Sequence, residues 1–244
     1  MRIKLNLSAR NDISIPIEYH YNIYLNLRKT VLQYLETRKP KLFGRYKKSF
    51  PGFTFSQLMI PERDVIDGFI KILGNYLSLY ISSEDDQLIE LIVRALSNSP
   101  QFTIFKIPFQ LKKIEVIEEP QFQPQMKFKM LSPLLLIKTD QSAVHFVKPG
   151  DSDLSQIFAS HLVSQYNRFF GTSFLPSQIQ LQLDQGYIER KKVVTRMMSI
   201  RNIHYRTIFC PIELKGETQL ISFAYRNGIG EKTSFGLGMI DVLS

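Results

Sequence analysis

The chain has 244 residues, of which 44% are hydrophobic and 12% aromatic, so it can bury a core and is not a disordered tail. Lysine and arginine outnumber acidic residues by 31 to 22, and the charge of +9 favours a polyanionic partner, with a merely basic surface as the alternative. The single Cys210 excludes an internal disulfide, and no apolar stretch approaches the ~20 residues that a bilayer span needs.

Hydrophobic periodicity in the first half predicts the order strand, helix, strand, strand, helix, strand. Ile3, Leu5 and Leu7 alternate with polar residues, as in a strand with one buried face. The six expected elements are residues 2–7, 19–37, 53–60, 73–81, 83–98 and 102–116. Residues 38–52 are basic and carry no apolar periodicity, so we expect a loop there. We expect Ser83 to cap the second helix and the last strand to bend near Pro108.

The second half is expected to repeat this order of elements. Residues 118–125 contain two prolines and no element, which predicts domains at 1–119 and 120–244. The expected strands are 128–137, 143–147, 179–183, 193–200, 203–214 and 236–242, with a helix after Asp151 or Ser152 and another at 216–225. The predicted fold class is α+β, with two tandem ferredoxin-like (RRM-like) domains, antiparallel sheets and a C-terminal glycine-rich loop.

That glycine-rich segment is the most specific motif. It contains two Gly-x-Gly pairs before the final strand, formed by Gly228, Gly230, Gly236 and Gly238. Glycines permit positive φ and close approach of another chain, so we expect exposed N–H groups that face phosphate oxygens. Glu231 precedes Lys232 where a Walker A loop has glycine, and no helix follows as in a Rossmann fingerprint. A tight turn that only packs a helix on the sheet is the alternative.

Four shorter motifs accompany this loop. They are Ile3-Lys4-Leu5, Ile15-Pro16 before Tyr19-His20-Tyr21, Phe53-Thr54-Phe55-Ser56, and Leu131-Ser132-Pro133-Leu134. Together with the loop, they resemble the repeat-RNA processing endoribonucleases of CRISPR systems, in the RAMP superfamily. The resemblance implies a protein that binds the repeat of precursor CRISPR RNA, as stem-loop or single strand, and cuts it without metal. The ribose 2′-hydroxyl would attack the adjacent phosphate and give a 2′,3′-cyclic phosphate and a 5′-hydroxyl.

The resemblance points to His20, Tyr46 and Lys48 as catalytic residues. Many members place a histidine in the first helix or the loop after it, but residues 38–52 contain none. His20 has an ordinary pKa near 6.5 that suits acid–base work. It also falls in line with Leu27 and Val31 on a helical wheel, so packing in the core is the alternative. Tyr46 and Lys48 would stabilise charge or position the RNA.

Basic residues in both halves are candidates for RNA binding. The run Arg190-Lys191-Lys192 and the arginines of the next two strands can grip stem phosphates, with a solvated hairpin tip as the alternative. The residues expected to contact RNA are Arg28, Lys29, Arg45, Lys47, Arg190, Lys191, Lys192, Arg196, Arg201, His204, Arg206, Gly228, Gly230, Lys232, Thr233, Ser234, Gly236 and Gly238.

The sequence is compatible with two other functions. One is a non-catalytic or weakly catalytic repeat-RNA-binding protein, and the other is a subunit of a CRISPR effector complex. A homodimer is open as well. We expect no cofactor, no metal, no DNA partner and no membrane contact, because the four histidines lack zinc-like spacing and the N-terminus lacks a signal sequence. The expected location is the cytoplasm.

Overall fold

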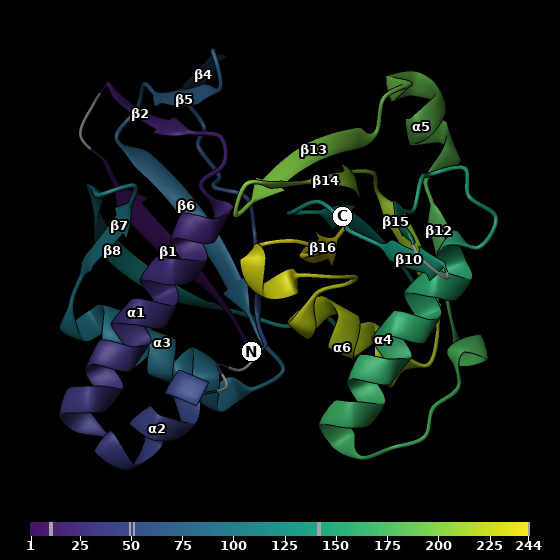
Figure 1. The fold of residues 1–244 in the computed structure, drawn as a ribbon, viewed down its shortest axis with the longest axis horizontal. Helices are drawn as coiled ribbons and strands as arrows, with labels where there is room; N and C mark the ends of the chain where they lie inside the picture. The colour runs from purple at the N-terminus through teal and green to yellow at the C-terminus, as the bar shows by residue number, and fades with distance from the viewer. Residues whose placement is uncertain (10–11, 49, 51, 141–142, 244) are drawn as a thin grey trace. The chain divides into compact units, whose positions relative to one another are not determined.

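The computed structural model describes residues 1–9, 12–48, 50, 52–140 and 143–243 (Figure 1). The chain divides into two compact units. Unit 1 contains residues 1–119 together with Ser234–Gly236, and unit 2 contains the remainder. That the halves are separate domains with a boundary at 119/120 stays a prediction. Among the described helices, none combines the length and the apolar character needed to cross a bilayer.

Unit 1 is built on a five-stranded antiparallel sheet with the strand order β3-β6-β1-β8-β7. The strands are β1 (Arg2–Ser8), β3 (Thr54–Phe55), β6 (Tyr76–Ser82), β7 (Gln101–Ile104) and β8 (Ile107–Ile117). Helix α1 (His20–Arg38) follows β1, and helix α3 (Asp86–Asn98) follows β6. Strands β3-β6-β1-β8 with these two crossover helices form the expected ferredoxin-like arrangement.

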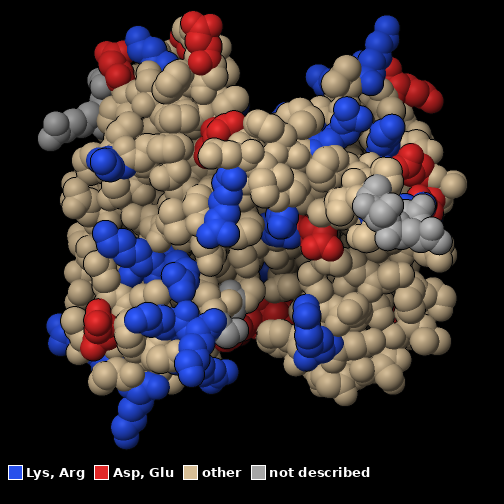
Figure 2. Space-filling view, viewed as in Figure 1, with Lys and Arg blue, Asp and Glu red and all other residues tan. Residues whose placement is uncertain are grey.

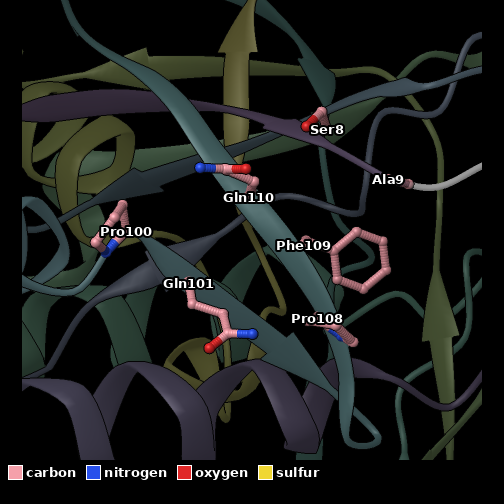
Figure 3. Close-up of a pocket in the computed structure, with 7 residues that line it drawn as sticks. All are labelled: Ser8, Ala9, Pro100, Gln101, Pro108, Phe109 and Gln110. Carbon is pink, nitrogen blue, oxygen red and sulfur yellow. The ribbon is translucent and has the colours of Figure 1, made fainter.

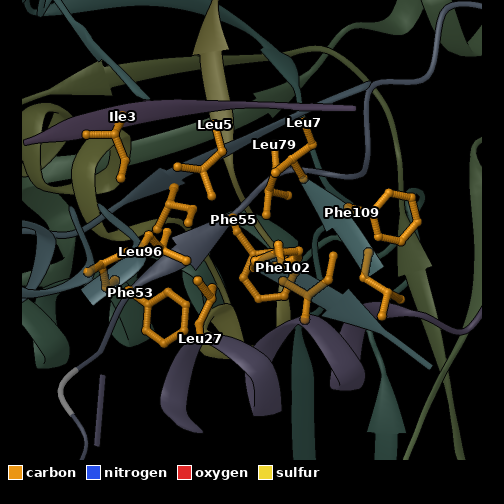
Figure 4. Close-up of a cluster of buried hydrophobic side chains, with 14 of the residues drawn as sticks. Ile3, Leu5, Leu7, Leu27, Phe53, Phe55, Leu79, Leu96, Phe102 and Phe109 are labelled. Atoms are coloured by element: carbon orange, nitrogen blue, oxygen red, sulfur yellow. The ribbon is translucent and has the colours of Figure 1, made fainter. Parts of the chain in front are cut away.

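The core of unit 1 lies between this sheet and its helices (Figure 4). Alternate residues of β1 point to the same face, so Ile3, Leu5 and Leu7 are all fully buried there. Leu27 of α1 and Leu96 of α3 pack on the same cluster. Each such side chain contributes about 1.5–3 kcal/mol through removal of apolar surface from water. The apolar residues whose spacing predicted α1 are therefore the ones that the helix buries against the sheet.

The basic stretch after α1 is a helix, and the expectation of a loop was wrong. Helix α2 spans Pro40–Lys48. Pro40 occupies its first turn, where the missing N–H has no partner to lose. Tyr46 is buried in the core of unit 1, and Leu42 and Phe43 pack against it, so one face of this short segment is apolar. Tertiary packing thus outweighs the unfavourable propensity of Gly44.

Two further differences in unit 1 arise from turns. The predicted bent strand 102–116 is a hairpin, because Phe105 and Lys106 adopt positive φ angles of 47° and 67° and reverse the chain. Residues 13–72 also add a second, three-stranded sheet of order β2-β5-β4 that the sequence pattern did not reveal. Its strands are β2 (Ile13–Pro16), β4 (Arg63–Ile66) and β5 (Phe69–Ile72).

Unit 2 repeats the ferredoxin-like order in a four-stranded sheet, β12-β15-β9-β16. The strands are β9 (Gln125–Met130), β12 (Ile179–Leu183), β15 (Ile212–Gly216) and β16 (Ile240–Val242), with helices α4 (Leu154–Phe170) and α6 (Thr218–Asn227). The predicted fold class is confirmed by this repeated topology. The strand expected at 203–214 is two strands, because β15 begins after a break at Phe209–Pro211.

Unit 2 contains additional elements between the strands and helices of its ferredoxin-like fold. Between β9 and α4 lies the hairpin β10 (Ile137–Asp140) and β11 (Ala143–Phe146). Between β12 and β15 lie helix α5 (Gln185–Lys191), which the sequence reading missed, and the hairpin β13 (Thr195–Ile200) and β14 (Ile203–Ile208). Short 3-10 turns occur at Pro176–Gln178 and Thr233–Phe235.

The observed N-caps of α3 and α4 lie within two residues of the predicted ones. Asp85, not Ser83, caps α3, and its carboxylate accepts a hydrogen bond from the Leu88 amide at 3.2 Å. Asp153 precedes α4, whereas the Asp151 carboxylate accepts a bond from the Lys148 amide in the preceding turn.

Candidate nucleic-acid interface

A dense basic surface covers α1 and α2 in unit 1. Residues 28–48 contain eight lysines and arginines and one acidic residue, Glu36. Figure 2 shows these cations gathered in the lower left of the view, over the two helices. The Arg28 guanidinium donates a hydrogen bond to the Lys47 carbonyl at 3.0 Å, which ties the end of α2 to α1. Lys29, Arg45, Lys47 and Lys48 are exposed, so their charges are available to a polyanion.

His20 lies inside the aromatic core of unit 1. Its side chain is 1% exposed and stacks on Tyr19, with ring centroids 4.4 Å apart. Neither ring nitrogen has a hydrogen-bond partner among the described residues. Burial lowers the pKa of His20 to about 3, so the ring is neutral at physiological pH and out of reach of a substrate. These surroundings match the core-packing alternative, and a catalytic role for His20 stays an untested prediction.

Tyr46 is also removed from solvent. Its ring is 5% exposed and packs edge-on against Phe50, and burial, assisted by the charge of Asp85, raises the pKa of its hydroxyl. The ring contacts continue from Phe50 to Phe53 and Phe55, and Phe55 stacks on His20. Three phenylalanines therefore stand in this row of contacts between His20 and Tyr46. Of the three residues predicted to be catalytic, only Lys48 is exposed.

A second basic surface lies on the insertion of unit 2. Residues 189–206 contain six arginines and lysines and one acidic residue, Glu189. The six, all exposed, are Arg190, Lys191, Lys192, Arg196, Arg201 and Arg206. The first two lie in the last turn of α5, and Lys192 follows it with a positive φ of 60°. The run of three charges therefore lies at the C-terminal end of this helix rather than at a hairpin tip.

The hairpin β13–β14 sets the positions of the remaining charges. Arg201 and Asn202 form its turn, with φ angles of 54° and 62°. Arg206 pairs with Met197 and His204 with Ser199, so both project from the same face of the hairpin. Arg196 projects from the other face, where its guanidinium lies 3.9 Å from the ring centroid of Phe209. The predicted RNA-binding residues of this hairpin are thus divided between two faces.

Several backbone amides of the glycine-rich loop donate hydrogen bonds to carbonyls of the protein itself. The amides of Gly228, Ile229, Glu231 and Gly238 donate to the carbonyls of residues 224, 238, 135 and 133, at 2.7–3.0 Å. The expectation of outward-facing amides was wrong for these four groups. Gly238 has a φ of +70°, and a Cβ there would lie 1.8 Å from the Ile229 carbonyl oxygen. The tight packing of this turn accounts for that glycine.

The residues between the glycine pairs have separate surroundings. Lys232 reaches the hairpin in unit 2, where its ammonium lies 5.3 Å from the ring centroid of Tyr205. Thr233 is buried, and Ser234 and Gly236 belong to unit 1. Between them, the Phe235 ring packs against Tyr24 with centroids 4.8 Å apart. Lys232 is therefore the member of this loop that joins a predicted basic surface.

The pairing of His161 with the loop was not predicted from the sequence. His161 Nε2 lies 3.0 Å from Glu231 Oε1, and this hydrogen bond holds the pKa of the Glu231 carboxyl below its usual range. The helical position of His161 was visible, but its partner is 70 positions away and no local pattern identifies it. The pair anchors the loop to α4.

Within the described ranges, no group of three or more histidine, cysteine, aspartate or glutamate side chains lies close enough to hold a metal ion. The absence of a metal from the reaction stays a prediction.

Comparison with known families shows which family the chain belongs to. Residues 117–242 match the model of the C-terminal part of CRISPR-associated protein Cas6, and residues 15–115 match that of the N-terminal part. The chain belongs to the Cas6 family. The resemblance inferred from the glycine-rich loop and its companion motifs is thereby confirmed.

Relatives in the Cas6 family match along nearly the whole chain. A Cas6 endoribonuclease-like protein of Pyrococcus furiosus is 25% identical, over 100% of this chain and 99% of the relative. The CRISPR-associated endoribonuclease Cas6 1 of Methanocaldococcus jannaschii is 27% identical, over 98% and 92%. A solved structure of a Cas6-related gene product from Pyrococcus furiosus superposes with a TM-score of 0.85 and 23% identity, over 100% of this chain and 98% of that chain. Its likeness supports the fold.

Proposed function

We propose that this chain binds the repeat of precursor CRISPR RNA. Membership of the Cas6 family carries the proposal. The net charge of +9 and the two basic surfaces, on α1–α2 and on α5 with β13–β14, supply the counterion-release term that drives RNA binding. A solved RAMP protein described as binding different RNA substrates superposes with a TM-score of 0.83. The residues that we propose to contact RNA are Arg28, Lys29, Arg45, Lys47, Arg190, Lys191, Lys192, Arg196, Arg201, His204, Arg206 and Lys232.

The hairpin surface favours recognition of shape and phosphates. A narrow A-form major groove admits no side chains, so exposed arginines sense the backbone of a stem more readily than its bases. Arg201 and Arg206 are well suited to this because Arg201 lies in the turn and Arg206 is exposed on one face of the same hairpin. Bidentate guanidinium–phosphate contacts add geometric selectivity.

Cleavage of the bound repeat is the enzymatic form of this proposal. In it, a bond forms between the 2′-oxygen and phosphorus, and the bond from phosphorus to the 5′-oxygen breaks, with the proton passing from the 2′-hydroxyl to the leaving oxygen. Relatives named endoribonucleases support this form. Exposed Lys48 and Arg45 would stabilise the negative charge of the pentavalent phosphate without a metal ion. His20 is not assigned a catalytic role.

Binding without fast cleavage is the second candidate, and the geometry favours it. His20 is buried with a pKa of about 3, and Tyr46 is buried with a raised pKa, so neither supplies an accessible base at neutral pH. General acid–base catalysis contributes about 10²–10⁴-fold to such reactions. If Lys48 stabilises the charge of the transition state and no accessible base assists it, the protein cleaves slowly or only carries the repeat RNA. Delivery of the RNA to an effector complex, and assembly as a homodimer, are compatible with either form.

A cleavage and binding assay tests both candidates. Repeat RNA transcribed from the CRISPR array of the same genome is end-labelled and incubated with protein in EDTA between pH 6 and 9. Tight binding with intact RNA supports the carrier. A 2′,3′-cyclic phosphate product that Lys48→Ala abolishes, and that Lys112→Ala retains, supports the enzyme, because Lys112 is an exposed lysine of unit 1 outside the proposed RNA contacts. Equal affinity for the repeat and for an unrelated RNA of the same length would refute the proposal as a whole.

A further inference from the structure

A row of four side chains crosses the sheet of unit 1 on the face opposite its helices. Tyr76 pairs with Ser8, Ser8 with Gln110, and Gln110 with Gln101, on the adjacent strands β6, β1, β8 and β7. Directly paired residues project from the same face of a sheet. Leu7, the next residue of β1, is fully buried in the core, so Ser8 and its row face away from it.

A cavity of about 340 Å³ lies at the end of this row (Figure 3). Its lining includes Ser8 of β1, Gln110 and Pro108 of β8, and Gln101 and Pro100 at the start of β7. The volume falls at the lower end of the range for small-molecule sites, roughly 300–1,000 Å³. The cavity is thus large enough for one planar ring system and too small for a folded partner.

The chemistry of the lining is neutral and rich in hydrogen-bonding groups. Among the residues that the structure describes, no charged side chain lines the cavity. Gln101 and Gln110 are both exposed, so their carboxamides are open to a ligand. Each carboxamide offers two donor hydrogens and an acceptor oxygen. Such a lining suits neither phosphate nor a metal ion, whereas it matches the edge of a nucleobase, which also carries donors and acceptors.

Tyr76 supplies an aromatic surface beside this cavity. Its ring is 42% exposed, and its hydroxyl donates a hydrogen bond to Asn6 Oδ1, which fixes the ring on the sheet. Two strand spacings, about 10 Å, separate Tyr76 from Gln110. That distance leaves room for a second base, and exposed tyrosines on sheets stack on bases irrespective of their identity.

We propose that this cavity takes one unpaired nucleobase of the bound RNA, with Gln101 and Gln110 reading its edge and Tyr76 stacking on the neighbouring base. The inference rests on the proposed RNA-binding function and adds a sequence-selective subsite to it. The basic surfaces bind phosphates of any sequence, whereas hydrogen bonds to a base edge distinguish one base from another.

An abasic scan of the repeat tests the proposal. Repeat RNAs that each lack one base are titrated against the full chain without substitutions and against the variants Gln110→Ala and Gln101→Ala. The control variant is Gln87→Ala, because Gln87 is an exposed glutamine of α3 outside the cavity. For the full chain, one unpaired position should raise Kd by roughly 5- to 150-fold when its base is removed. Gln110→Ala and Gln101→Ala should lose most of that penalty at the same position, and Gln87→Ala should retain it.

The outcomes separate this inference from the function on which it rests. If the full chain prefers repeat RNA but both cavity variants show the same abasic penalties as the full chain, the base subsite is refuted and the binding function stands. If the full chain shows no preference for repeat RNA, the proposed function fails and the subsite fails with it. Retention of native Tm in each variant excludes misfolding as the cause of a lost penalty.

Discussion

Replacement of Gly236 by alanine should strongly destabilise unit 1. Gly236 has a φ of +77°, and a Cβ at this position would lie 2.2 Å from Cε2 of Phe55, a fully buried ring. The left-handed conformation costs alanine about 1–2 kcal/mol. Forcing the overlap on a packed ring costs about 1–3 kcal/mol more. We therefore expect Gly236→Ala to lower the free energy of unfolding by about 2–5 kcal/mol, a fall in Tm of about 4–20 °C.

Gly68→Ala is the matched control. Gly68 also lies in unit 1 and has a φ of +79°, but nothing lies within 4 Å of its added Cβ. It should show the conformational cost alone, about 1–2 kcal/mol. Urea unfolding of the two variants measures the difference. If Gly236→Ala costs no more than Gly68→Ala, the loop does not pack on Phe55 as described.

Three further predictions concern unit 1. His20 is neutral in the fold, with a pKa of about 3, but titrates near 6.5 when unfolded, so the unfolded chain binds the extra proton between these values. Stability should fall as pH drops from 6.5 towards 3, by about 1.4 kcal/mol per unit, and His20→Phe should remove this dependence in urea titrations. Lys106→Gly should stabilise the hairpin turn by about 1 kcal/mol in calorimetry, since φ is +67° there; an unchanged Tm would contradict the turn geometry. Asp85→Ala should cost about 0.5–2 kcal/mol by loss of the bond from the Leu88 amide, and Asp85→Asn should not.

Local patterns predicted the elements whose burial is periodic. The alternation of Ile3, Leu5 and Leu7 predicted β1, and the spacing of Leu27 and Val31 predicted α1, because these residues face one core. The sheet β2-β5-β4 was missed because it forms from strands separated by about fifty positions, and its exposed edge lacks alternation. Helix α2 was missed because its stability comes from the burial of Tyr46 rather than from propensity.

The sequence predicted which basic residues form the candidate RNA-binding surfaces, but not which of the predicted catalytic residues are exposed. Clustered charge identifies basic surfaces from the sequence, since lysine and arginine are rarely buried without a partner. Whether a side chain is exposed depends on the tertiary structure, and the rings of Tyr19 and Phe55 stack on His20 and help to bury it. The glycine pairs were recognised correctly as a specific motif, but the carbonyls that accept from the amides of Glu231 and Gly238, at residues 135 and 133, lie about 100 positions away. No local rule reports such partners.

The salt dependence of repeat-RNA binding tests directly whether the arginines of the β13–β14 hairpin contact RNA phosphates. Kd for repeat RNA is measured from 50 to 300 mM KCl for the full chain, for Arg201→Ala with Arg206→Ala, and for a control that replaces the exposed Lys127 and Lys148 of the same unit. Each phosphate contact contributes about 0.9 to the slope of log K against log salt. We expect replacement of the two arginines to lower this slope by about 2 and replacement of the two lysines to leave it unchanged. Equal slopes for all three proteins would contradict this expectation.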